Sequence, residues 1–245
     1  LGLLLKDRPQ AGQRVLALGD PDYTATAKTT AASLRTRGGA LTRLLPLPAT
    51  RAEVERIGTT KLLGAQATES DLAAALENEE RWRAVHFAFH GLVDPESPML
   101  SALALTADSE YDGFLTALEI FRMRIPADLV VMSACETGKG RVYQTEGIVG
   151  LTRAFMFAGA PRVLCSLWKV DDDATRALMT RFYELWNPRA QPGDPEQGPQ
   201  GRVEGPERRG LPAAEALRQA QAHVRSQVQW AHPCYWAAWV LWGLP

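Results

Sequence analysis

Short runs of apolar residues alternate with amphipathic stretches along most of the chain. Each run is apolar on both faces and stops at a turn signal, which is typical of strands buried in a parallel sheet. The runs occupy residues 14–19, 41–45, 61–64, 85–90, 128–133, 162–167 and 236–242. Stretches with helical character lie between them, at residues 25–37, 51–57, 68–78, 115–121, 146–158, 174–186 and 212–228. This order predicts an α/β fold with a mostly parallel central sheet and right-handed crossovers.

Local signals refine this pattern at the ends of the predicted elements. Thr50, Thr116 and Asp173 stand at or next to the start of predicted helices, where a side-chain oxygen can accept a hydrogen bond from the first turn. Residues 101–106 show some alternation, so we expect a small hairpin beyond the edge of the main sheet.

Residues 187–210 differ from the rest of the chain. Five prolines stand there among glycines and charged residues, and such a composition cannot bury much apolar surface. We therefore expect a flexible insertion at about 187–210 within a single domain that spans residues 1–245.

Composition excludes several classes of function. Of the 245 residues, 46% are apolar and 22% are charged, and the net charge of −1 gives no general attraction to nucleic acid or to an acidic membrane. No apolar run approaches the ~20 residues that a membrane-spanning helix needs. Three cysteines without a Cys-x-x-Cys pair argue against a disulfide framework or a zinc ribbon and favour the cytoplasm. Because the first residue is Leu and not Met, we expect the chain to be a piece of a longer protein.

Two of the predicted strands stop at a reactive side chain. His90 ends the run 85–90 and Cys135 follows the run 128–133, and each is succeeded by a turn that contains glycine. Sites in open parallel sheets form beyond the carboxyl ends of the strands, so we expect both side chains at one edge of the sheet, exposed where their strands end. A thiol beside an imidazole is a nucleophile, because the imidazole accepts the proton and the thiolate attacks carbonyl carbon.

Each of these residues also has a structural interpretation. A single cysteine at the end of a strand is most often a small buried apolar residue, and a single histidine there is most often a structural one. His86 and His90 are four residues apart, but zinc is disfavoured because the run is too short and aromatic for a helix and Phe87 stands where a His-Glu-x-x-His motif needs glutamate. We predict neither a metal nor a cofactor.

Four motifs in order resemble those of the CHAT domain. They are His90-Gly91, Ser133-Ala-Cys135-Glu-Thr-Gly, Glu146-Gly-Ile-Val-Gly-Leu-Thr-Arg-Ala-Phe and Ser166-Leu-Trp168-Lys-Val-Asp171-Asp172. The resemblance covers nearly the whole chain and includes Asp112-Gly-Phe-Leu-Thr-Ala-Leu-Glu-Ile and Tyr235-Trp-Ala-Ala-Trp-Val-Leu-Trp-Gly. CHAT domains are caspase-like and separase-like peptidase modules, often joined to tetratricopeptide repeats, so the resemblance implies a three-layer α/β/α sandwich of caspase type. The insertion at 187–210 looks longer than is usual in this family.

The resemblance assigns a role to each matching residue. Cys135 is expected to be the nucleophile and His90 the general base, while the backbone N–H groups of Gly91 and Cys135 are expected to form the oxyanion hole. No third member of a triad is evident, and a dyad suffices if a backbone carbonyl orients the imidazole.

The acidic turn after the predicted strand 162–167 is the candidate specificity site. Asp172, with Asp171 beside it, is expected to bind a basic side chain before the scissile bond, as in the separase-like relatives, and Trp168 is expected to wall the pocket. The competing interpretation is that these acids only complement the positive end of a helix. Cys165 is expected in the core, and Cys234 beside His232 is not expected to form a second site.

Three functions remain open at this point. The first is a cysteine endopeptidase that acts on a protein substrate and is regulated by a partner or by N-terminal repeats outside this chain. The second is a signalling or interaction module that has the same fold but does not cleave. The third is another thiol hydrolase or an acyltransferase that acts on a small molecule.

Overall fold

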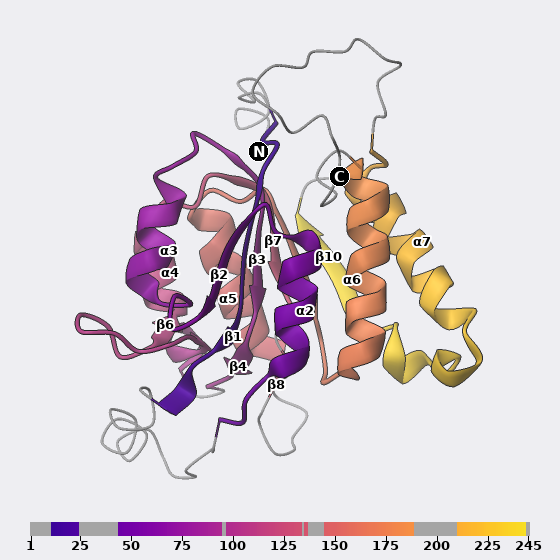
Figure 1. The fold of residues 1–245 in the computed structure, drawn as a ribbon, viewed down its shortest axis with the longest axis horizontal. Helices are drawn as coiled ribbons and strands as arrows, with labels where there is room; N and C mark the ends of the chain where they lie inside the picture. The colour runs from indigo at the N-terminus through magenta and orange to yellow at the C-terminus, as the bar shows by residue number, and fades with distance from the viewer. Residues whose placement is uncertain are drawn as a thin grey trace.

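A computed structural model of the chain describes residues 11–24, 44–94, 97–133, 135–136, 145–188 and 210–243 (Figure 1). The helix predicted at 25–37, most of the strand predicted at 41–45 and most of the insertion predicted at 187–210 lie outside these residues. The other predicted elements are within them and can be compared with the structure.

The centre of the fold is a six-stranded sheet with the strand order β10-β9-β7-β3-β1-β2. Its strands are β1 (Val15–Pro21), β2 (Thr60–Gly64), β3 (Trp82–Ala88), β7 (Ala127–Met132), β9 (Arg162–Ser166) and β10 (Trp239–Gly243). All neighbouring pairs are parallel except β9 with β10, which are antiparallel. The predicted parallel sheet is therefore confirmed, with one antiparallel strand at its edge.

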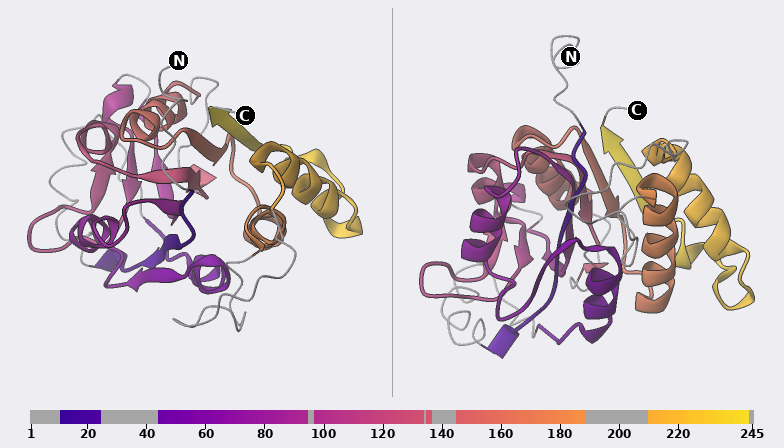
Figure 2. Two further views of the ribbon diagram at one scale, coloured as in Figure 1. Left: turned by 90° about the horizontal axis from the view of Figure 1, so that it is seen from above. Right: turned by 45° about the horizontal axis from the view of Figure 1, so that its top comes forward.

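Helices cover both faces of this sheet (Figures 1 and 2). On one face lie α3 (Glu69–Leu76), α4 (Ala117–Arg122) and α5 (Thr145–Phe157), and on the other lie α2 (Pro48–Ile57), α6 (Asp172–Trp186) and α7 (Ala213–Arg225). Alternate residues of each strand enter opposite cores: Leu16 packs with the first set of helices and Ala17 with the second. The predicted α/β/α sandwich is confirmed.

A second sheet of four short strands extends the carboxyl edge of the first. Its order is β6 (Phe114–Thr116), β5 (Ala102–Ala104), β4 (His90–Leu92) and β8 (Cys135–Glu136). The antiparallel pairing of β5 with both β4 and β6 accounts for the alternating run at 101–106. Short 3₁₀ turns complete the described elements: η3 (Pro98–Leu100), η6 (Val228–Trp230) and η7 (Pro233–Tyr235).

Helix starts agree with the sequence only in part. Thr116 caps α4 as predicted, in a reciprocal pair with Glu119. The prediction that Asp173 caps its helix is wrong, because α6 begins earlier and Asp171 accepts the hydrogen bond from the N–H of Ala174 at 3.0 Å. Thr50 is not a cap either: α2 already begins at Pro48, and the Thr50 hydroxyl accepts from the backbone N–H of Asp20.

A buried carboxyl group at the start of α3 gives the fold a specific dependence on pH. Glu69 is only 5% exposed and its Oε1 has no hydrogen-bond partner among the described residues. Burial, and then the negative charges of Glu119, Asp112 and Asp108, raises the pKa of Glu69 from 4.5 to about 8. The folded chain thus holds a proton that the unfolded chain releases, so stability falls as the pH rises between these values.

We predict that Glu69→Gln, which is neutral and of the same shape, stabilises the chain at pH 7 by about 1–2 kcal/mol. Its free energy of unfolding in urea should also change less than the wild-type value between pH 5 and pH 8, since the titrating group is gone. Glu77→Gln, at the other end of the same helix, is the control. An unchanged pH profile in Glu69→Gln would contradict this assignment.

Candidate functional site

The candidate site forms where two neighbouring strands of the main sheet end together. Strands β3 and β7 are paired in parallel, and the last backbone hydrogen bond between them runs from the Ser133 N–H to the Phe87 carbonyl at 2.8 Å. On its other side β3 loses its neighbour after the pair Gly19–Ala88, because Asp20 of β1 turns into the left-handed region with φ 48°. Beyond this point both chains continue into the second sheet as β4 and β8.

In that second sheet the two candidate residues face each other across one strand spacing. Strands β4 and β8 pair in parallel, with the Cα of His90 opposite that of Cys135 and the Cα of Gly91 opposite that of Glu136. Neighbouring strands are about 4.8 Å apart. His90 and Cys135, which are 45 positions apart in the sequence, are therefore neighbours across two paired strands.

The expected positions within the strands need correction. His90 does not end a strand and Cys135 does not follow one directly; each is the first residue of a new short strand. His90 is also not exposed, since only 7% of its surface is accessible. Its imidazole is covered by the ring of Tyr23 and contacts the carbonyl of Leu45.

The imidazole of His90 is oriented by a backbone carbonyl. Its Nε2 lies 2.8 Å from the carbonyl oxygen of Leu45, which can only accept a hydrogen bond. We therefore assign the ring proton to Nε2. Nδ1 is buried and has no hydrogen-bond partner among the described residues, so in the neutral ring it offers a lone pair. This is the proton acceptor that a nucleophilic thiol requires.

Tyr23 fixes the other side of the same imidazole. The two rings stack with centroids 5.5 Å apart and an interplanar angle of 28°. The Tyr23 hydroxyl donates to the carbonyl of Ala104 at 3.1 Å and lies 3.5 Å from the backbone N of His90, which donates to it. The His90 side chain is thus held by an aromatic face and by a carbonyl, and its own backbone is tied to the same tyrosine.

The surroundings favour the neutral form of His90. Burial lowers the pKa of the imidazole below its ordinary value, and the positive charge of Lys169 lowers it further. The hydrogen bond to Leu45 and the negative charge of Asp172 act in the opposite direction but do not reverse the shift. A neutral imidazole is the form that can remove a proton from a thiol.

Gly91 is the second residue of β4, next to His90. It borders a cavity of about 20 Å³ that is also lined by Met132, Cys165 and Ser166. A space of that size holds about one water molecule. The cavity is therefore too small for the side chain of a substrate.

The aspartates of the acidic turn have different surroundings in the structure. Asp171 is committed to the N-terminus of α6 as its cap. Asp172 is the acid whose charge acts on His90, and burial, followed by the charge of Asp171, raises the pKa of its carboxyl group. Trp168 is partly exposed in the preceding turn, and its Nε1–H donates to the carbonyl of Cys234 at 3.1 Å. Asp172 is thus the acid of this turn whose charge acts on the imidazole, opposed by the charge of Lys169 in the same turn.

The remaining cysteines that the structure describes do not join this arrangement. Cys165 is buried as predicted, and burial raises the pKa of its thiol to about 11, which keeps the thiol protonated. Cys234 is exposed beside His232, whose Nδ1 accepts from the Cys234 backbone N–H at 3.2 Å. That histidine caps a 3₁₀ turn.

The buried histidine of β3 connects the two helices that flank the site. Nε2 of His86 lies 3.0 Å from Oε1 of Glu53 in α2, and its Nδ1 lies 3.3 Å from the hydroxyl of Tyr183 in α6. All three side chains are buried. They hold α2 and α6 against the strand that leads to His90.

Sequence reasoning missed two residues of the site. Tyr23 follows the carboxyl end of β1, and that position could have suggested it, since such loops lie at the same edge as His90. Leu45 acts through its backbone carbonyl, so its side chain carries no signal of the role.

The chain is an α/β/α sandwich in which a histidine and a cysteine lie opposite each other on paired strands at the carboxyl edge of the main sheet. Comparison with known proteins specifies the family. The CHAT domain family model matches residues 3–244. The chain belongs to the CHAT domain family.

Two curated relatives are tetratricopeptide repeat protein 28 of mouse and of human. Each is 29% identical to this chain over 241 residues, a match that covers 81% of the chain. The chain spans only 9% of the length of the mouse protein and 8% of the human one. Among solved structures, a chain of the Saccharomyces cerevisiae separase–securin complex superposes with a TM-score of 0.52 and 16% identity, over 100% of this chain and 13% of that one. This last likeness shows a shared fold.

We predict that nitrogen-15 NMR of the His90 ring shows the proton on Nε2 at neutral pH and a pKa below the ordinary 6.5. Spectra of His90→Asn assign the signal, and His86 and the exposed His232 serve as internal comparisons. A proton on Nδ1, or a raised pKa, would be incompatible with the contact to the Leu45 carbonyl.

Proposed function

We propose that this chain is a cysteine endopeptidase domain in which His90 and Cys135 form a catalytic dyad. The observation that carries the proposal is the parallel register that sets the two residues opposite each other. The orientation of His90 supports it, because the Leu45 carbonyl leaves Nδ1 as the proton acceptor. Membership of the CHAT family and a fold shared with the separase complex chain are consistent with the same function.

The proposed reaction has two stages. In the first, His90 takes the thiol proton, the Cys135 sulfur attacks the carbonyl carbon of the scissile bond, and the departing amine leaves with the proton that His90 returns. In the second, His90 removes a proton from water, and the resulting attack on the thioester releases the acid and restores the thiol. The N–H groups of Gly91 and Cys135 are the proposed donors to the oxyanion in both stages, and one such donor contributes about 3 kcal/mol.

Asp172 is the proposed determinant of specificity. Support comes from the charge of Asp172, which acts on the His90 imidazole against the opposing charge of Lys169 in the same turn. A carboxylate there would pair with Arg or Lys before the scissile bond. Asp171 is proposed to add negative charge to the pocket that binds the basic side chain, and Trp168 is proposed to form a wall of that pocket.

The proposed setting is cytoplasmic, with a protein as substrate. None of the helices in the described ranges is long and apolar enough to cross a membrane. The curated relatives are named for tetratricopeptide repeats and are much longer than this chain. We propose that such repeats, or a separate regulatory protein, control the dyad.

One observation favours a second candidate, an interaction module that does not cleave. The cavity beside Gly91 is only about 20 Å³ and His90 is buried. A peptidase needs room for a substrate beside the dyad, whereas a binding module does not. Covalent labelling of Cys135 by a thiol-reactive peptide ketone with arginine before the ketone separates the two, because only a peptidase orients the thiol toward a peptide carbonyl.

We predict that Cys135→Ala and His90→Ala each lower peptide cleavage by at least about a thousandfold, since each removes one half of the dyad. The measurement is kcat/KM on a protein or peptide substrate found by mass spectrometry. Cys234→Ala, which removes an exposed thiol elsewhere, should cleave at the wild-type rate. Cleavage by the Cys135→Ala variant at a rate near wild type would overturn the proposal.

We also predict that Asp172→Asn raises KM for substrates with Arg or Lys before the scissile bond by roughly tenfold, through loss of one charge-assisted contact. Asp173→Asn is the matched control, because Asp173 pairs with Arg176 on the outer surface of α6. A profile of cleaved peptides without basic preference, unchanged in Asp172→Asn, would refute the assigned role.

A further inference from the structure

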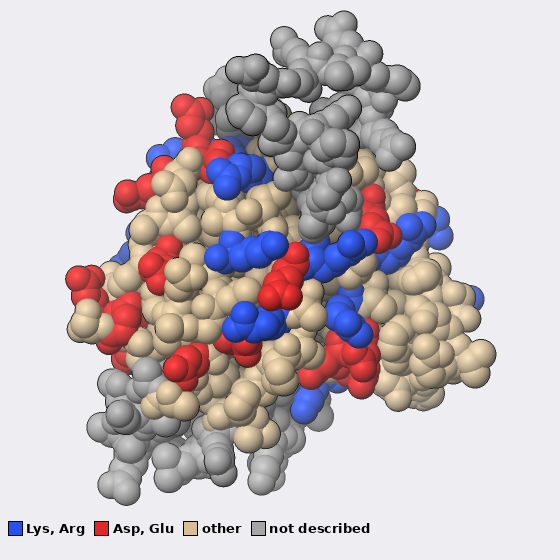
Figure 3. Space-filling view, viewed as in Figure 1, with Lys and Arg blue, Asp and Glu red and all other residues tan. Residues whose placement is uncertain are grey.

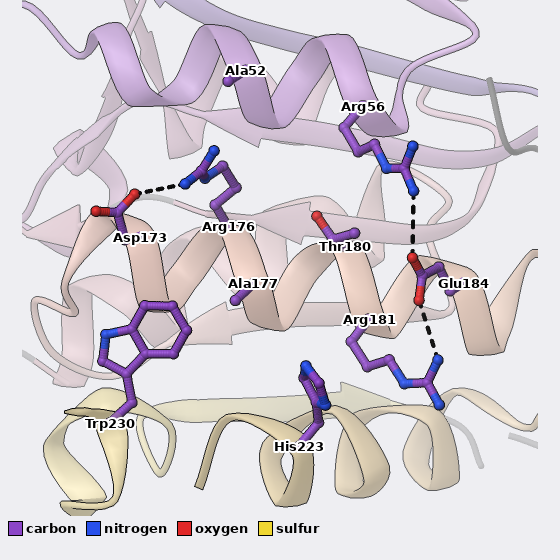
Figure 4. A pocket seen from close by; sticks show the side chains of 10 residues that line it. All are labelled: Ala52, Arg56, Asp173, Arg176, Ala177, Thr180, Arg181, Glu184, His223 and Trp230. Atoms are coloured by element: carbon purple, nitrogen blue, oxygen red, sulfur yellow. Dashed lines mark hydrogen bonds and ion pairs between the residues drawn. The ribbon is translucent and has the colours of Figure 1, made fainter. Parts of the chain in front are cut away.

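A groove separate from the candidate site runs along the outer face of α6. Its volume is about 460 Å³, with α6 as the floor, α2 as one wall and α7 with η6 as the other (Figure 4). The α6 residues that line it run from Asp173 to Glu184, about 16 Å of helix. An extended peptide covers that length with about five residues.

Arginines dominate the charge of the groove. Arg56 comes from α2, and Arg176 and Arg181 come from α6, against the two carboxylates of Asp173 and Glu184. On the corresponding face of the molecule, Lys and Arg side chains lie over α2 and α6 with Asp and Glu side chains among them (Figure 3). The lining is therefore net positive, although the whole chain carries a net charge of −1.

Two of the three guanidinium groups, those of Arg56 and Arg181, are only loosely engaged by these carboxylates. Glu184 is shared by Arg56 at 3.5 Å and Arg181 at 3.2 Å, both longer than a strong charge-assisted bond (Figure 4). Arg176 makes a closer contact with Asp173, at 2.8 Å, but the two side chains are 48% and 66% exposed. Exposed pairs of this kind contribute little to stability, so an incoming carboxylate can replace them at low cost.

The rest of the lining suits the backbone of a peptide. Ala52, Ala177 and Thr180 have short side chains, which leave room between the helices for a main chain to approach. Trp230 stands at the end near Asp173, where its indole offers an apolar face (Figure 4). A small anion would use the arginines alone, whereas a peptide uses the length, the floor and the indole together.

We propose that this groove binds an acidic peptide segment of a partner protein, with carboxylates on Arg56, Arg176 and Arg181 and an apolar side chain against Trp230. The groove residues come from helices on one face of the sheet, while His90 and Cys135 lie in the second sheet. Binding therefore requires neither cleavage nor an assembled dyad, and it can be measured whether or not the chain is a peptidase.

The test is fluorescence anisotropy with a fluorescein-labelled hexapeptide of alternating glutamate and leucine. We expect saturable binding at low salt that weakens when ionic strength rises from about 50 to about 300 mM. A peptide with glutamine in place of glutamate should bind at least about tenfold more weakly, since it lacks the charge. Failure of the wild-type chain to bind the acidic peptide saturably up to 1 mM would overturn the proposal.

Two kinds of variant locate the binding. Arg56→Gln and Arg181→Gln should each lower the affinity for the peptide by roughly tenfold, because each removes a charge-assisted bond. Ala177→Phe should block peptide binding without a change of charge, because the larger side chain fills the groove. Arg218→Gln is the matched control, because Arg218 is an exposed arginine on α7 that pairs with Glu215 outside the groove. Equal affinity in all four variants would place the binding elsewhere and refute the proposal, and circular dichroism verifies that each variant is folded.

Discussion

The parallel pairing of β4 with β8 is the constraint on which the candidate site depends. Strands β3 and β7 are neighbours in the main sheet, so the chains that leave them start side by side. Because both chains then pair again in the second sheet, His90 and Cys135 come into register without any direct contact in the main sheet. A one-residue slip in this short ladder would move one of the two residues to the opposite face.

Supports from distant parts of the chain hold the imidazole within this frame. The Leu45 carbonyl selects the ring nitrogen that carries the proton, and Tyr23 stacks against the ring. Helix α2, which begins three residues after Leu45, is anchored to β3 through the buried contact between Glu53 and His86. A buried polar contact of this kind resists rearrangement, because a partner left alone would have neither solvent nor the opposite group beside it.

The sequence was sufficient for the architecture because buried parallel strands leave a strong signal. The apolar runs around Val85, Val130 and Val163 all proved to be strands of the main sheet. The two candidate residues lie just beyond two of these strands, at the start of β4 and of β8. The break after β3 was not predictable, since the apolar alternation of Phe87 and Phe89 continues through it and the pairing partner changes only in three dimensions.

Other features depend on contacts that no local pattern records. Asp171, Asp172 and Asp173 are equivalent as a sequence, and only the true start of α6 shows which one caps the helix. The groove joins Arg56, Arg181 and His223, which are far apart along the chain. The contribution of Leu45 comes from its carbonyl and would be the same for many other side chains.

The most direct test of the central claim is the pH dependence of alkylation at Cys135. Iodoacetamide reacts with the thiolate, so the rate followed by mass spectrometry in a Cys234→Ser background reports the pKa of the Cys135 thiol. If the imidazole and the thiol are adjacent, His90→Asn changes the midpoint or shape of this profile. An identical profile with and without His90 would contradict the arrangement.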